Sequence, residues 1–187
     1  MIVLASKSPR RKKILTELGY NFIVCPAQND EIFDLSLGLD EALKKVAKQK
    51  ALEVQDKYPS DLIVSADTIV CFKNLILGKP KDELDAISTL KMLSNHKHQV
   101  KTGVCVLYKE KAIVHVETSD VYFKELSDTA ILDYVHSGKC MDKAGSYGIQ
   151  ECDFVDHISG DYSNIVGLPK VRVDAMIKAF AQREHKC

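Results

Sequence analysis

The strongest structural signal in the chain is the segment LIVSADTIV, which runs from Leu62 to Val70. Its first five residues are apolar or small, which is typical of an inner strand buried on both faces of a sheet. Ligands of such sheets bind outside the carboxyl ends of the strands. Asp67, at the end of the LIVSA run, is therefore a candidate functional carboxylate. The alternative, that Asp67 only caps its own turn, stays open at this point.

Predicted helices and strands surround this run. The expected strands cover 2–5, 21–25, 62–72, 99–107, 113–123, 154–158 and 162–166, and the expected helices cover 10–18, 39–55, 82–93, 127–136 and 168–182. The two long strands around the turn at 109–111 are expected to run antiparallel, and 154–166 is expected to form a hairpin. This order predicts an α/β fold with a mixed sheet and flanking helices.

Composition excludes several classes of protein. A chain of 187 residues with 45% hydrophobic residues is expected to form one domain over 1–187, or two small lobes that share a sheet. Lys+Arg and Asp+Glu both total 26, so no basic excess favours nucleic acid as a partner. The six cysteines form no CxxC pair, which argues against a zinc knuckle or a redox dithiol.

No segment approaches a membrane span or a signal-peptide core. The apolar stretch before Ser6 is shorter than the roughly 7–15 residues of a signal peptide, and a membrane span needs roughly 18 apolar residues. We therefore expect a cytoplasmic protein with no membrane partner.

The segment SKSPRRKK, at 6–13, joins the first strand to the first predicted helix. A helix N-terminus presents free N–H groups and a partial positive charge, and Arg10 and Arg11 add side-chain cations to it. Cations there oppose the helix dipole, which is easier to understand if an anion sits among them. A solvated basic face is the alternative interpretation.

Two lysines are further candidates for an anion site. Lys79 lies in a Gly-Lys-Pro turn soon after the buried strand, and Lys50 lies in the helix predicted before it. A lone lysine on a helix is usually solvated, so Lys50 carries little weight by itself. The chain has neither the GxxxxGK[ST] of a P-loop nor a dinucleotide GxGxxG.

A serine hydrolase is not indicated. Ser8, His157 and Asp67 would be the candidate triad, but the chain has no GxSxG elbow. His96 and His98 alternate in a strand-like segment and are interpreted as polar surface positions.

Several short motifs together resemble one family. In chain order they are LASKSPRR at 4–11, Glu31, AKQKA at 47–51, SADTIV at 65–70, GKP at 78–80, TGV at 102–104, DKAGSYGIQ at 142–150 and GDYSNIVGLP at 160–169. Each motif is weak alone, but their joint order and spacing are specific. The chain is similar to the Maf family of septum-formation-inhibitor-like nucleotide pyrophosphatases.

The resemblance implies a fold, a reaction and partners. The implied fold is a long, twisted mixed sheet with flanking helices, in two lobes around a cleft, usually as a homodimer. The implied reaction is hydrolysis of a nucleoside triphosphate to the monophosphate and pyrophosphate with a divalent cation, Mg²⁺ or Mn²⁺. The segment Tyr147-Gly148-Ile149-Gln150 is similar to the branch that acts on dTTP and UTP.

The resemblance also assigns roles by position. Asp67 is the implied proton acceptor, and Glu31 is implied to help hold the metal, with Asp67 as a possible second ligand. The positions implied around the phosphates are Ser6, Arg11, Lys50 and Lys79, and those tied to substrate choice are Arg10, Thr68 and Gln150. Lys7 departs from the family pattern, because a small residue is expected between the two serines.

Three alternatives remain open at this point. Asp67 is either the base or a metal ligand. The protein is either an enzyme or a non-catalytic nucleotide-binding regulator of cell division. An enzyme of this kind acts either on ordinary dTTP and UTP or on modified pyrimidine nucleotides in a housecleaning role.

Overall fold

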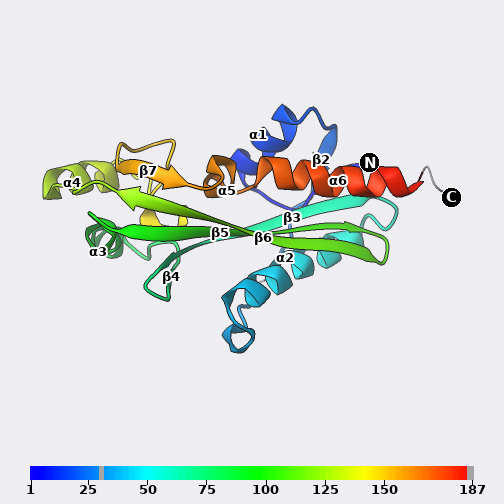
Figure 1. The fold of residues 1–187 in the computed structure, drawn as a ribbon, viewed down its shortest axis with the longest axis horizontal. Helices are drawn as coiled ribbons and strands as arrows, with labels where there is room; N and C mark the ends of the chain where they lie inside the picture. The colour runs from blue at the N-terminus through cyan, green and yellow to red at the C-terminus, as the bar shows by residue number, and fades with distance from the viewer. Residues whose placement is uncertain (30–31, 185–187) are drawn as a thin grey trace. The chain divides into compact units, whose positions relative to one another are not determined.

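The computed structural model describes residues 1–29 and 32–184 of the chain (Figure 1). The strands are β1 (Ile2–Leu4), β2 (Phe22–Val24), β3 (Leu62–Phe72), β4 (Leu75–Leu77), β5 (Lys97–Tyr108), β6 (Lys111–Phe123) and β7 (Val155–Ser159). The helices are α1 (Pro9–Glu17), α2 (Leu39–Gln55), α3 (Glu83–Leu93), α4 (Asp128–His136), α5 (Tyr162–Val166) and α6 (Lys170–Glu184), with short 3-10 turns at Leu35–Leu37 and Ala144–Ser146. The predicted alternation of strands and helices is confirmed.

The strands form one mixed sheet in the order β2-β1-β3-β5-β6-β7, with β4 paired to β3. β1 runs parallel to β2 and to β3, with Leu4 opposite Val64. β4 is antiparallel to β3, and β7 is antiparallel to β6. A two-residue turn joins β5 to β6, so these long strands are antiparallel as expected.

β3 continues past Asp67 to Phe72, as expected for the strand over 62–72. Residues 68–72 keep the strand conformation because they are mostly apolar or β-branched, and Val70 to Phe72 pair with β4. The parallel pairing of β3 with β1 nevertheless stops at Val64. Asp67 therefore lies just beyond the carboxyl end of the parallel ladder rather than at the end of β3.

The hairpin predicted over 154–166 is wrong in its second half. β7 pairs with β6, but residues Tyr162–Val166 form helix α5. The Asp161 carboxylate accepts hydrogen bonds from the backbone N–H and the hydroxyl of Ser163, at 2.7 and 2.6 Å. Such a cap at the start of the segment favours a helix over a strand.

The chain divides into two compact units, and β3, β5 and β6 contribute residues to both. Unit 1 comprises residues 1–67, 102–117 and 167–187, and unit 2 comprises residues 68–101 and 118–166. Among residues 1–29 and 32–184, none of the helices has the length and apolar character that crossing a bilayer requires.

One part of the core of unit 1 lies between α2 and the sheet. Apolar residues of α2, spaced at helical intervals, pack against β1, β3 and β5; they are Ala47, Ala51 and Val54. Figure 1 shows α1 and α6 on the opposite side of the sheet from α2. Gly103 in β5 allows the close approach of α2, because a Cβ there would lie 2.8 Å from both Cγ and the carbonyl oxygen of Leu43.

The core of unit 2 is formed by α3 and α4 against the remaining parts of the long strands. Its buried side chains include Val70, Leu90, Val121, Phe123, Ile131 and Phe154. Tyr147, from the loop after α4, is buried in the same cluster with 5% of its surface exposed. The DKAGSYGIQ motif is therefore anchored in the core and is not a free loop.

Candidate functional site

Asp67 and Lys50 form a buried ion pair in unit 1. The Lys50 ammonium donates to Oδ1 of Asp67 at 2.6 Å, and the two side chains are only 13% and 9% exposed. Two charges removed from water in this way must compensate each other, since either alone would carry the full cost of its desolvation. Asp67 is therefore a paired carboxylate in the sheet and not a simple turn cap.

A second contact between the same elements explains how the pair is positioned. The hydroxyl of Ser65 donates to the carbonyl of Ala47 at 2.6 Å, and both groups are buried. Ser65 and Asp67 are two residues apart and share one face of β3, while Ala47 and Lys50 are three apart and share one face of α2. The motifs AKQKA and SADTIV are thus joined at two successive points.

The loop after β1 holds Arg11 in place. The Arg11 guanidinium donates from Nη1 to the Ser6 hydroxyl at 3.1 Å and from Nε to the Gly167 carbonyl at 2.8 Å. Ser8 caps α1 by accepting from the backbone N–H of Arg11, and Pro9 follows it. The structure therefore links the LASKSPRR motif to the GLP end of GDYSNIVGLP within unit 1.

The first turn of α1 suits an anion. It contains no acidic residue, while Arg10 and Arg11 both belong to it. Ser6 is 8% exposed, and both arginines are half-buried. Fixed cations beside the N-terminus of a helix favour a bound anion such as a phosphate group.

In unit 2, two loops meet at Gly145. Its backbone N–H donates to the carbonyl of Gly78 at 3.0 Å, and a Cβ on it would lie 3.0 Å from the methyl groups of Val70 in β3. Gly145 also has a φ of 71°, a left-handed conformation that glycine adopts without strain. The motifs SADTIV, GKP and DKAGSYGIQ therefore converge there.

The convergence fixes the backbone next to Lys79. Gly78 is held by Gly145, and Pro80 is buried, whereas the Lys79 side chain is exposed. Gln150 is also exposed, and Thr68 is half-buried in β3. These three candidate residues all belong to unit 2.

His98 and Tyr147 form a buried polar pair in unit 2. Nε2 of His98 lies 2.7 Å from the Tyr147 hydroxyl. The rings of His98 and Phe123 meet edge to face, with 4.8 Å between their centroids. Burial lowers the pKa of His98 to about 4, a shift that the charge of Asp120 only partly opposes, and burial raises the pKa of Tyr147. The interpretation of His98 as a surface residue is wrong, because it lies on the same strand face as buried Val100.

The implied metal ligand Glu31 lies outside the described residues. Within residues 1–29 and 32–184, no three His, Cys, Asp or Glu side chains are grouped so that they could hold a metal ion. Asp67, the other implied ligand, is the carboxylate paired with Lys50.

Comparison with known proteins identifies the family. The model of the family described as Maf-like protein matches residues 1–180. The chain belongs to the Maf family. It is similar to a dTTP/UTP pyrophosphatase of Halalkalibacterium halodurans, at 43% identity over 179 residues that cover 95% of this chain and 94% of that protein.

Two other curated relatives are equally similar to this Maf chain. A dTTP/UTP pyrophosphatase of Koribacter versatilis is 44% identical, covering 95% of this chain and 93% of that protein. A dTTP/UTP pyrophosphatase of Pyrococcus abyssi is 43% identical, covering 98% of each chain.

A solved nucleoside-triphosphatase of Mycobacterium abscessus, also titled dITP/XTP pyrophosphatase, shares 11% identity at a TM-score of 0.43, covering 67% of this chain and 75% of that one.

Sequence reasoning missed two buried groups of this Maf chain. His98 alternates with Lys97, Gln99 and Lys101 and shares its strand face with apolar Val100, and this position was the available signal. Lys143 belongs to the DKAGSYGIQ motif but received no role. Its burial, at 7% exposure, is visible only in the fold.

The buried His98 makes stability depend on pH. The unfolded chain binds a proton on this histidine below about pH 6.5, whereas the native state does so only below about pH 4. The stability that neutral His98 contributes is therefore fully present above about pH 6.5 and is lost as the pH falls toward 4. Between pH 7 and pH 5, this group should lower the unfolding free energy by about 2 kcal/mol.

Urea unfolding of the wild type and of His98→Gln at pH 7 and pH 5 measures this contribution. The wild type should lose more stability than the variant, because the amide does not titrate. Equal losses in the two proteins would contradict the assignment of a neutral, buried His98.

Proposed function

We propose that this protein hydrolyses dTTP and UTP to the nucleoside monophosphate and pyrophosphate. The buried Lys50–Asp67 pair is the observation that carries the proposal, since it sets a carboxylate just beyond the carboxyl end of the parallel ladder. The names of three curated relatives, 43–44% identical over most of the chain, support the same activity.

Phosphoryl-type transfer requires neutralised charge and an aligned water, with little covalent chemistry by the protein. Arg11, fixed between Ser6 and Gly167, is suited to bidentate contact with phosphate oxygens. Lys79 adds an exposed point charge on a fixed backbone. We assign the phosphates to these groups together with Lys50.

The proposed step is attack of water on the α-phosphorus. The water oxygen forms the new bond, the bond between the α-phosphorus and the bridging oxygen breaks, and pyrophosphate leaves. Asp67 accepts the proton of the water, which is the role of a general base. Lys50 keeps the carboxylate oriented, because its ammonium holds Oδ1 at 2.6 Å.

The chemistry of the ligands fits a divalent cation that arrives with the substrate. Mg²⁺ is usually held by one or two carboxylates plus substrate phosphates and retained water, and Mn²⁺ prefers similar oxygen ligands. We propose Glu31 as a protein ligand, with Asp67 as the second ligand in the alternative in which it binds the metal instead of accepting the proton. When bound, such an ion supplies positive charge to the phosphate oxygens and favours deprotonation of water.

Gln150 is proposed to read the nucleobase. Its amide both donates and accepts hydrogen bonds, as the imide edge of uracil or thymine requires. It is exposed on a turn anchored in unit 2, and Thr68 and Arg10 are the other residues assigned to substrate choice. Hydrogen bonds to the imide edge do not involve the 5-position of the base. We therefore propose 5-substituted pyrimidine nucleotides as further substrates, in a housecleaning role.

The family resemblance also leads us to propose a homodimer located in the cytoplasm. Light scattering of the purified protein tests the first of these proposals, and fractionation of cells that express it tests the second.

Pyrophosphate release tests the proposed reaction most simply. A panel of UTP, dTTP, CTP, ATP, GTP and 5-substituted pyrimidine triphosphates is assayed with Mg²⁺, with Mn²⁺ or with a chelator. We expect pyrophosphate and monophosphate from UTP and dTTP, and loss of activity with the chelator. Binding of UTP without turnover under every condition would favour a non-catalytic regulator instead.

Asp67→Asn should reduce kcat by about 10²- to 10⁴-fold, the usual contribution of a general base. The variant should also be less stable by up to about 3–5 kcal/mol, because the neutral amide accepts from Lys50 but no longer compensates its buried charge. Turnover of UTP is measured together with circular dichroism and thermal unfolding, and Asp56→Asn, an exposed position at the end of α2, is the matched control. Near-normal turnover by a folded Asp67→Asn protein would remove Asp67 from the mechanism.

Gln150→Ala should lower the preference for UTP over CTP by about 5- to 150-fold, since a lost hydrogen bond to a substrate costs about 1–3 kcal/mol. The ratio of kcat/KM for the two substrates measures this. Gln182→Ala, at an exposed position on α6, is the control. An unchanged ratio would show that Gln150 does not read the base.

A further inference from the structure

A single turn presents Gln150. The backbone N–H of Glu151 donates to the carbonyl of Gly148 at 2.8 Å, which closes a turn with Ile149 and Gln150 at its two central positions. Ile149 packs against the core of unit 2, while Gln150 is exposed. The place of the Gln150 amide therefore depends on how the two ends of this turn, Gly148 and Glu151, are held.

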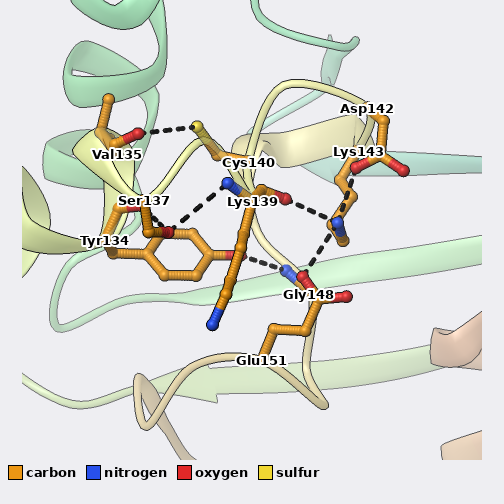
Figure 2. A network of polar contacts seen from close by, with 9 residues as sticks. All are labelled: Tyr134, Val135, Ser137, Lys139, Cys140, Asp142, Lys143, Gly148 and Glu151. Atoms are coloured by element: carbon orange, nitrogen blue, oxygen red, sulfur yellow. Dashed lines mark hydrogen bonds and ion pairs between the residues drawn. The ribbon is translucent and has the colours of Figure 1, made fainter.

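Lys143 holds the second end of the turn. Its ammonium contacts Oε2 of Glu151 at 3.0 Å and donates to the Lys139 carbonyl and to Oδ1 of Asp142, both at 2.6 Å. Figure 2 shows the ammonium among these three oxygens. An ammonium has three protons to donate, so the three contacts satisfy it fully. The Lys143 side chain is only 8% exposed, so all three of its ammonium protons are used in contacts within the protein.

The aliphatic part of Lys143 lies against the first end of the turn. A Cβ on Gly148 would be 2.7 Å from Cε and 2.9 Å from Cδ of Lys143. Gly148 has no positive φ, so its backbone does not require glycine. The constraint is space: a larger residue would push against a lysine stem whose end is fixed by three contacts.

α4 supplies another contact to the same end. The backbone N–H of Gly148 donates to the hydroxyl of Tyr134 at 3.0 Å, as Figure 2 shows. Tyr134 is itself buried in the core of unit 2, at 8% exposure. The turn is thus held at one end by Tyr134 and the Lys143 stem, and at the other end by the Lys143 ammonium.

We propose that Lys143 is a positioning residue that sets the place of Gln150 by holding both ends of the Gly148–Glu151 turn, and so controls selectivity for the base. This role rests on the proposed function, because it presumes that Gln150 reads the base. Lys143 acts through the turn and does not contact the substrate.

The first test is kinetic. Lys143→Met removes the ammonium and keeps most of the stem, and it should lower the kcat/KM ratio of UTP to CTP by about 10- to 100-fold, the cost of a misplaced positioning group. The loss should appear mainly in KM for UTP. In a Gln150→Ala background the same substitution should leave the ratio almost unchanged, because its effect passes through Gln150.

A matched control and a second variant accompany this test. Lys124→Met removes a lysine of the same unit that pairs with the exposed Asp153, and it should leave the ratio unchanged. Gly148→Ala perturbs the turn from its other end and keeps the ammonium, so it should lower the ratio in the same direction. This second variant carries the test if Lys143→Met does not fold.

The second test does not depend on activity. Amide hydrogen exchange of Glu151 and Gly148 reports whether the turn is held, and Lys143→Met should accelerate both by roughly tenfold or more; in Gly148→Ala, the exchange of Glu151 should accelerate likewise. A wild type that does not hydrolyse UTP would refute the proposed function but leave this exchange result standing.

Two results would overturn the role of Lys143. One is unchanged exchange and an unchanged substrate ratio in a folded Lys143→Met protein. The other is an equal loss of kcat for every triphosphate that persists in the Gln150→Ala background, which would make Lys143 a direct phosphate ligand.

Discussion

The contact between Lys50 and Asp67 constrains the rest of unit 1. Each of these charges would cost several kcal/mol to bury alone, so α2 must dock on the sheet in the one position that brings them together. The hydrogen bond from Ser65 to Ala47 and the absence of a side chain at Gly103 satisfy the same requirement. A carboxylate held in a low-dielectric environment is also more effective on a reacting group than one in water, because it is already oriented.

In unit 2, buried contacts support exposed residues on short loops. Lys79 and Gln150 both present their side chains outward, yet their loops are anchored by buried contacts. Gly145 ties the Gly-Lys-Pro loop to the segment before Gln150, and His98 holds Tyr147 in the core. Such support matters for function, since catalytic and binding groups need a rigid frame to keep their geometry.

Much of this organisation could be predicted from the sequence. The helix over Leu39–Gln55 and the mixed sheet follow from hydrophobic spacing, because burial of one face is a local pattern. α5 was mistaken for a strand, since a five-residue segment has too little periodicity to decide and its cap, Asp161, looked like a turn residue. The burial of Lys50 and Lys143 could not be predicted, because it depends on partners 17 and 8 residues away.

We propose that this protein directs water to the α-phosphorus and that Asp67 accepts the proton of that water. Hydrolysis of UTP in ¹⁸O-labelled water, with the products separated and weighed by mass spectrometry, tests it most directly. One ¹⁸O atom should appear in UMP and none in pyrophosphate. Label in pyrophosphate instead, or release of UDP with labelled orthophosphate, would place the attack on another phosphorus and contradict the account.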